Sequence, residues 1–139
     1  MRWRYILNIT GWLIFFLGAG MTLPLVMAIK SSTAEALPLA LSLIVTMGCG
    51  AMLALLFRTR PGEFISAREG ITVVALCWTA AGLFGAFPFY FGGVFPTFTD
   101  AFFESVSGFT TTGASVMTDI ESVDKAILLW RSFIQWLGG

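Results

Sequence analysis

The sequence predicts an all-α membrane protein with two leading transmembrane helices, a third helix, a short re-entrant segment and the start of another helix. Hydrophobic residues make up 57% of the 139 residues and charged residues only 12%, about half the charged fraction of a typical soluble domain. The charges leave three long uncharged runs, between Arg4 and Lys30, Glu35 and Arg58, and Glu69 and Asp100. Each run exceeds the roughly 20 apolar residues that cross a bilayer core as a helix.

These runs predict membrane spans at residues 5–29, 37–57 and 71–89. Pro88 is expected to kink or end the third helix, which we place at residues 71–91. Residues 1–70 then hold the two leading helices and a polar turn, and residues 71–139 form a second unit. Arginines precede the first span and follow the second: Arg2, Arg4, Arg58, Arg60 and Arg68. Because basic loops remain in the cytoplasm, the N-terminus is predicted to be cytoplasmic.

Composition argues against several classes of protein. The 8 basic and 8 acidic residues cancel, so no basic surface points to nucleic acid. Cys49 and Cys77 lie inside apolar runs, where thiols pack as small side chains. The stretch from Ser105 to Gly108 suggests an intramembrane serine protease, but the sequence has no histidine to activate a nucleophile. We therefore expect no enzyme.

Small residues recur at helical spacing in the second and third spans. The two rows are Ser42, Thr46, Gly50 and Ala54, and Ala75, Thr79, Gly82 and Ala86. Such rows let helix backbones approach closely in lipid. They predict helix packing, with a substrate path as the alternative.

A short helix is predicted at residues 100–109, with Thr99 as its N-cap and Asp100 in its first turn. It is too short to cross a bilayer, and an oxygen-rich run at residues 110–115 follows it. A new apolar helix starts at residues 126–139. This order is typical of a re-entrant pore loop, where backbone carbonyls replace the water around a cation and glycine supplies unusual dihedrals. An ordinary outer loop is the alternative interpretation.

The segments DAFFESVSGFTTTGAS (100–115) and LWRSFIQWLGG (129–139) closely resemble the first pore loop and the following helix of the TrkH/KtrB superfamily of potassium transporters. The resemblance implies four repeats of helix, pore loop and helix around one pathway, as in a potassium channel, and places this chain in the TrkH branch. The filter strand would then be Thr110, Thr111, Thr112, Gly113 and Ala114, with K⁺ bound at Thr111, Thr112 and Gly113. Gly113 matches the filter glycine, and serine at this place accompanies sodium preference in related plant proteins.

The resemblance also implies a function and a setting for the chain. It implies potassium uptake across the bacterial cytoplasmic (inner) membrane, with this chain supplying one quarter of the selectivity filter. K⁺ is the transported ion, and no resident cofactor is expected. The expected partners are membrane lipid, a cytoplasmic nucleotide-binding regulatory subunit and, at full length, a second copy. Channel-like transport and coupling to protons or sodium remain open.

Length separates this sequence from the family pattern. Four repeats need a much longer chain, so the resemblance implies an N-terminal fragment. A truncated, non-conducting membrane fragment or scaffold is the alternative function.

Charged residues around the loop have more than one interpretation. Arg131 could pair with Glu104 or Asp100 of the short helix, extend to the lipid headgroups, or act directly in ion passage. Asp119, Glu121 and Asp124 could concentrate cations at the outer mouth or simply face water.

Overall fold

The computed structural model describes residues 2–59 and 66–139 and folds them into seven helices, with no strand among them. The helices are α1 (Trp3–Gly20), α2 (Thr22–Lys30), α3 (Ala36–Leu56), α4 (Ala67–Gly85), α5 (Phe87–Phe91), α6 (Phe98–Phe109) and α7 (Lys125–Gly138). The predicted all-helical class is confirmed. Arg60, Pro61 and Gly62 of the predicted polar turn lie outside the described residues.

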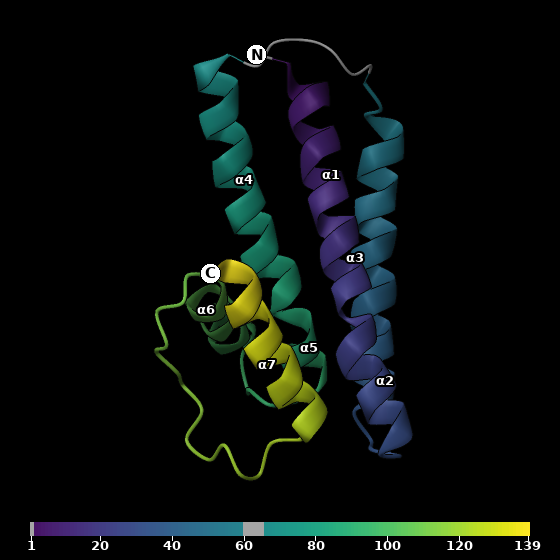
Figure 1. Cartoon of the computed structure of the whole chain (residues 1–139), viewed down its shortest axis with the longest axis vertical. Coiled ribbons are helices and arrows are strands. Elements are labelled where there is room, and N and C mark those ends of the chain that lie inside the picture. The colour runs from purple at the N-terminus through teal and green to yellow at the C-terminus, as the bar shows by residue number, and fades with distance from the viewer. Residues whose placement is uncertain (1, 60–65) are drawn as a thin grey trace.

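The first predicted span is a column of two helices, α1 and α2, with a break at Met21 (Figure 1). Pro24 explains the break, because it lacks the N–H that would bond to the Gly20 carbonyl and its ring crowds that oxygen. At the break, the Thr22 hydroxyl donates to the Ala19 carbonyl at 2.7 Å. The sequence interpretation missed this interruption, although α1 and α2 together still form one candidate membrane span, Trp3–Lys30.

The helix α3 packs against this column through the small residues predicted for helix packing. Its buried face includes Ser42, Thr46, Gly50 and Ala54. A methyl group at Gly50 would lie 2.8 Å from the Phe15 Cα, and one at Gly11 would lie 2.6 Å from the Ala54 nitrogen. The two backbones therefore approach closely where a glycine on one helix faces the backbone of the other, which confirms the packing role of this row.

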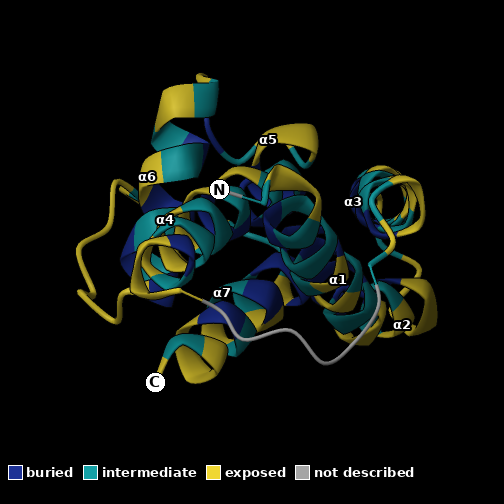
Figure 2. Ribbon diagram, turned by 90° about the horizontal axis from the view of Figure 1, so that it is seen from above, coloured by how far each residue is buried: buried dark blue, intermediate teal, exposed yellow. Residues whose placement is uncertain are grey.

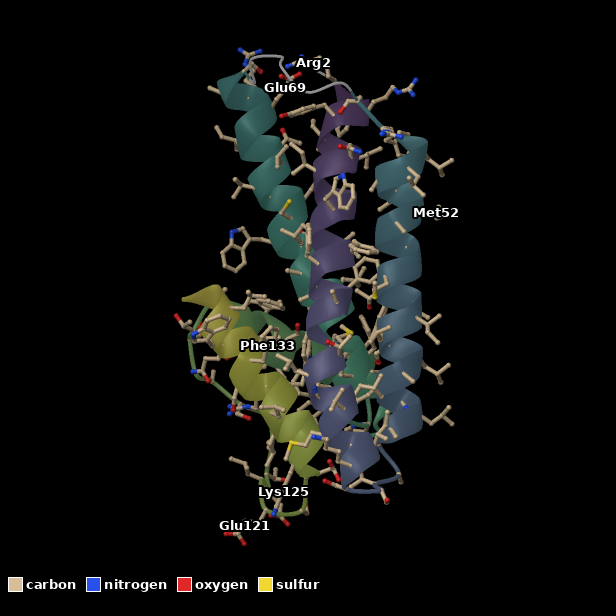
Figure 3. The ribbon with its side chains drawn as sticks, turned by 45° about the vertical axis from the view of Figure 1, so that its right-hand side comes forward. Arg2, Met52, Glu69, Glu121, Lys125 and Phe133 are labelled. Carbon is tan, nitrogen blue, oxygen red and sulfur yellow. The ribbon has the colours of Figure 1, made fainter. Side chains whose placement is uncertain are left out.

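On the other side of α1 lies α4 (Figure 2), which starts at Ala67 rather than at residue 71. Ser66 sets this start. Its hydroxyl accepts from the Glu69 N–H at 3.3 Å and its own N–H donates to the Glu69 carboxylate at 3.2 Å, which is a capping box. The same carboxylate accepts from the Arg2 guanidinium at 3.0 Å and ties α4 to the start of α1 (Figure 3).

The helix breaks near Pro88, as predicted, so residues 71–91 are not one helix: α4 ends at Gly85 and α5 follows. Only the lower half of the second small-residue row packs inside the described chain. Gly82 and Ala86 are buried, whereas Ala75 and Thr79 are exposed.

Three stretches are long and apolar enough to cross a membrane: Trp3–Lys30, Ala36–Leu56 and Ala67–Phe91. Their outward faces expose large apolar side chains such as Ile44, Leu55 and Ile71, an arrangement suited to lipid rather than to water. Arg2 and Glu69 lie at one end of the molecule, and Glu121 and Lys125 lie at the other (Figure 3). The end that carries Arg2 is therefore opposite the end that carries Glu121, as the three-span count requires.

Candidate functional site

The short helix α6 lies beside the lower half of α4 and is seen almost end-on in Figure 1. Its 12 residues extend about 18 Å, too short to cross a bilayer core. Its N-cap is Thr97, whose hydroxyl accepts from the Asp100 N–H at 3.2 Å. The predicted cap at Thr99 and the predicted start at residue 100 were therefore wrong, because the helix begins at Phe98.

Close contacts with α4 and α7 hold α6 in place. A methyl group at Gly82 would lie 2.8 Å from the Val106 side chain, so α6 sits almost on the α4 backbone. The fully buried Trp130 of α7 donates its indole N–H to the Gly85 carbonyl at 3.0 Å. The three helices thus meet at the end of α4, and these contacts fix the position of α6 relative to α4 and α7.

The C-terminus of α6 has the hydrogen bonds of a Schellman motif. The Thr112 N–H donates to the Ser107 carbonyl and the Thr111 N–H donates to the Gly108 carbonyl, each at 3.0 Å. This motif needs one residue in the left-handed conformation, and Thr111 supplies it with φ +54. Positive φ is uncommon for a β-branched residue and marks local strain, which proteins retain mainly at functional sites.

Gly113 has the second positive φ of the loop, +77, and a β-carbon there would meet nothing within 4 Å. The glycine is therefore explained by its backbone conformation rather than by packing. Thr110, by contrast, has φ −82. Positive φ at Thr111 and again at Gly113 gives the strand the unusual dihedrals expected of a filter-like backbone.

The loop presents oxygen atoms on an open side. Residues 110–116 are all exposed, and the Thr110 and Thr112 hydroxyls lie 2.8 Å apart. The opposite side of the loop is occupied by α6. This strand can therefore supply oxygens from one direction only, whereas a dehydrated cation needs them all around.

Ser107 fixes the far end of this strand, since its hydroxyl donates to the Ala114 carbonyl at 2.5 Å. The Ala114 carbonyl thus faces α6, unlike the open side of the loop. The sequence interpretation counted Ala114 as an ion-binding residue and considered Ser107 only for protease chemistry. Nothing local to either residue indicates this contact, because the loop must first fold back.

Glu104 connects the loop to two helices. Its side chain is 1% exposed and accepts from the Ser115 hydroxyl at 3.0 Å and from the Val116 N–H at 3.2 Å. The Arg131 Nε donates to the same carboxylate at 2.6 Å. We name these four residues the Glu104 clamp. Of the three interpretations of Arg131, this geometry is that of an ion pair with Glu104, while Asp100 bonds to Thr97.

The acidic residues after the loop have separate local roles. Asp124 caps α7 by accepting from the Ala126 N–H at 2.7 Å, and Asp119 accepts from the Glu121 N–H. Glu35, in the turn between α2 and α3, lies near Asp124. Burial, and to a lesser degree this second carboxylate, raise the pKa of Glu35 above its ordinary value.

The sequence of this chain is similar to those of known transport proteins. Residues 39–139 match the family model described as TrkH, cation transport protein. The chain is 38% identical over its whole length to the Trk system potassium uptake protein TrkH of Escherichia coli K12. It is 32% identical over 99% of its length to the Trk system potassium uptake protein TrkI of Halomonas elongata.

A solved structure has the same fold. The potassium transporter TrkH from Vibrio parahaemolyticus superposes with a TM-score of 0.91 at 37% identity, over 99% of this chain and 30% of that one. The chain spans 29% of the length of the Escherichia coli relative and 28% of the Halomonas relative. These relatives are transport proteins of the membrane and not enzymes, so the expectation of a multi-pass, non-enzymatic membrane protein is confirmed.

Proposed function

We propose that this chain, which belongs to the TrkH family of cation transport proteins, supplies one quarter of a potassium selectivity filter in a Trk-type uptake system. The observation that carries the proposal is the exposed, oxygen-rich strand after α6, with positive φ at Thr111 and Gly113. The relatives are named as potassium uptake proteins, which supports K⁺ as the ion that the filter selects.

In this proposal Thr111, Thr112 and Gly113 contribute the oxygens that replace the water around K⁺. Thr110 and Ala114 flank them, with the Ala114 carbonyl held by Ser107. The C-terminal end of α6, which carries partial negative charge, lies beside the entering cation. Because one strand covers the ion from one side only, the chain acts together with three similar strands.

The Glu104 clamp gives the strand its rigidity. A filter discriminates between K⁺ and Na⁺ only when its oxygens keep their number and spacing. Glu104 holds the residues that directly follow the strand, Ser115 and Val116, and Arg131 anchors the carboxylate to α7. We therefore assign the pair a positioning role rather than a direct contact with the ion.

The proposed orientation and membrane follow from the positions of the arginines and from the family. The N-terminus and the arginines Arg2, Arg4 and Arg58 lie in the cytoplasm of a bacterium, and the membrane is its inner membrane. A cytoplasmic nucleotide-binding subunit regulates the system, two full-length copies associate, and K⁺ enters as the transported ion without a resident cofactor. The name "Trk system" supports a multi-component assembly.

The decisive experiment compares Gly113→Ser with Gly93→Ser in the native protein that carries this sequence, reconstituted in liposomes. Both glycines have positive φ and open space around a β-carbon, so both variants suffer the same backbone strain. Only Gly113→Ser is expected to lower the K⁺/Na⁺ flux ratio. Equal ratios in the two variants would contradict the filter assignment, and absence of any flux in the native protein would favour a scaffold.

A further inference from the structure

The last turn of α7 touches the point where α6 passes into the filter strand. A β-carbon built on Gly138 would lie 2.6 Å from the carbonyl carbon of Phe109 and 2.9 Å from its Cα, and would overlap the carbonyl oxygen. Phe109 is the last residue of α6 and is buried. At the next position, a β-carbon on Gly139 would lie 3.6 Å from the Thr111 side chain. The end of α7 is thus seated against the first residues of the loop.

Two helical glycines that meet no backbone make a useful contrast with Gly138. A β-carbon on Gly108 would meet only the end of the Ile134 side chain, at 2.6 Å, and that group can rotate away. A β-carbon on Gly48 of α3 would meet nothing within 4 Å. At Gly138 the obstacle is the Phe109 backbone, which cannot yield without moving α6 or the strand.

The Phe109 backbone is continuous with the turn that sets the strand. The carbonyls of the three residues before it accept the N–H groups of Thr110, Thr111 and Thr112. The Phe109 carbonyl itself faces Gly138, where a glycine hydrogen takes the place of the β-carbon, the arrangement of a weak C–H···O contact. A displacement of Phe109 would therefore pass directly to Thr111, whose left-handed conformation starts the strand.

We propose that Gly138 is a positioning residue for ion selectivity: its missing side chain lets α7 seat against the Phe109 carbonyl and so holds the start of the filter strand. The proposal rests on the proposed function. It gives α7 a second role in placing the loop, at the loop's beginning, in addition to the bond from Arg131 to Glu104, which holds the residues that follow the strand.

The test substitutes Gly138→Ala in the native protein and measures K⁺ and Na⁺ fluxes in liposomes. We expect the K⁺/Na⁺ flux ratio to fall about tenfold, which corresponds to about 1.4 kcal/mol of relative ion stabilisation. Gly48→Ala, in a helix and with open space around its β-carbon, is the matched control and should retain the native ratio. Alanine favours helix over glycine, so a loss at Gly138 alone cannot come from weakened helix propensity.

Two outcomes would overturn the proposal. The first is a native flux ratio in Gly138→Ala while Gly113→Ser loses selectivity, which would leave the filter assignment intact. If Gly138→Ala does not accumulate, Gly139→Val is measured instead, because its branched side chain crowds Thr111 without overlapping backbone. An unchanged K⁺/Na⁺ flux ratio in Gly139→Val is the second outcome. A native ratio in Gly113→Ser would instead contradict the proposed function itself.

Discussion

Removal of the Glu104 carboxylate is the most informative perturbation of the loop. In Glu104→Ala, the Ser115 hydroxyl and the Val116 N–H lose their acceptor and the Arg131 side chain loses its counter-ion. We expect both a less stable protein and a strand that no longer ends in a fixed position.

The magnitude follows from burial. The Glu104 side chain is 1% exposed and that of Arg131 is 26% exposed. Breaking a buried ion pair by removing one partner costs about 3–5 kcal/mol, and the partial exposure of Arg131 favours the lower end of that range. Glu104→Gln keeps the shape and one acceptor oxygen but removes the charge that pairs with Arg131, so it should cost about 1.5–3 kcal/mol.

The assay is a double-mutant cycle with Glu104→Gln, Arg131→Met and the double variant. The thermal midpoint in detergent and the K⁺/Na⁺ flux ratio are both measured. Because Arg131→Met leaves a buried carboxylate without its cation, the double variant should be more stable than that single variant. Glu121→Gln, an exposed carboxylate in the following loop, serves as the control. Strictly additive effects in the cycle would refute the clamp.

Three further predictions concern the helices around the site. Gly50→Val should lower the thermal midpoint by forcing a side chain into the backbone of α1, a cost of about 1–3 kcal/mol, whereas Gly48→Val, in open space, should change it little. Trp130→Phe removes the indole donor to the Gly85 carbonyl and should cost about 1–3 kcal/mol, read from the midpoint; an unchanged midpoint would mean that another donor replaces it. Because the pKa of Glu35 is raised in the folded protein, the folded state holds its proton more tightly, so stability should fall as pH rises from 4.5 through the raised pKa. Glu35→Gln should flatten that fall in midpoint against pH, and an unaltered pH profile would contradict it.

Features that depend on local sequence could be predicted well. The bilayer imposes a minimum apolar length, so the three spans follow from the positions of charges alone. Pro88 interrupts a continuing helix because it lacks the N–H of the helical hydrogen bond, and Gly113 accepts a conformation that other residues resist. The small residues of α3 were recognised because one face of a helix repeats at a fixed spacing.

Local boundaries were less certain where two candidates compete. Thr97 rather than Thr99 caps α6, and the two threonines offer the same hydroxyl, so only the backbone path distinguishes them. Pro24 had the same potential to break a helix as Pro88, but the long apolar run around it suggested an uninterrupted span.

The sequence by itself therefore determined the membrane class, the order of long helix, short helix and glycine loop, and the glycine in that loop. Tertiary structure decided which atoms hold the loop. Glu104 and Arg131 are 27 residues apart in the chain, and Gly138 reaches Phe109 only because α7 packs back across α6. Contacts of this kind depend on the relative placement of whole helices, which is set by packing over the entire unit and not by the residues that finally touch.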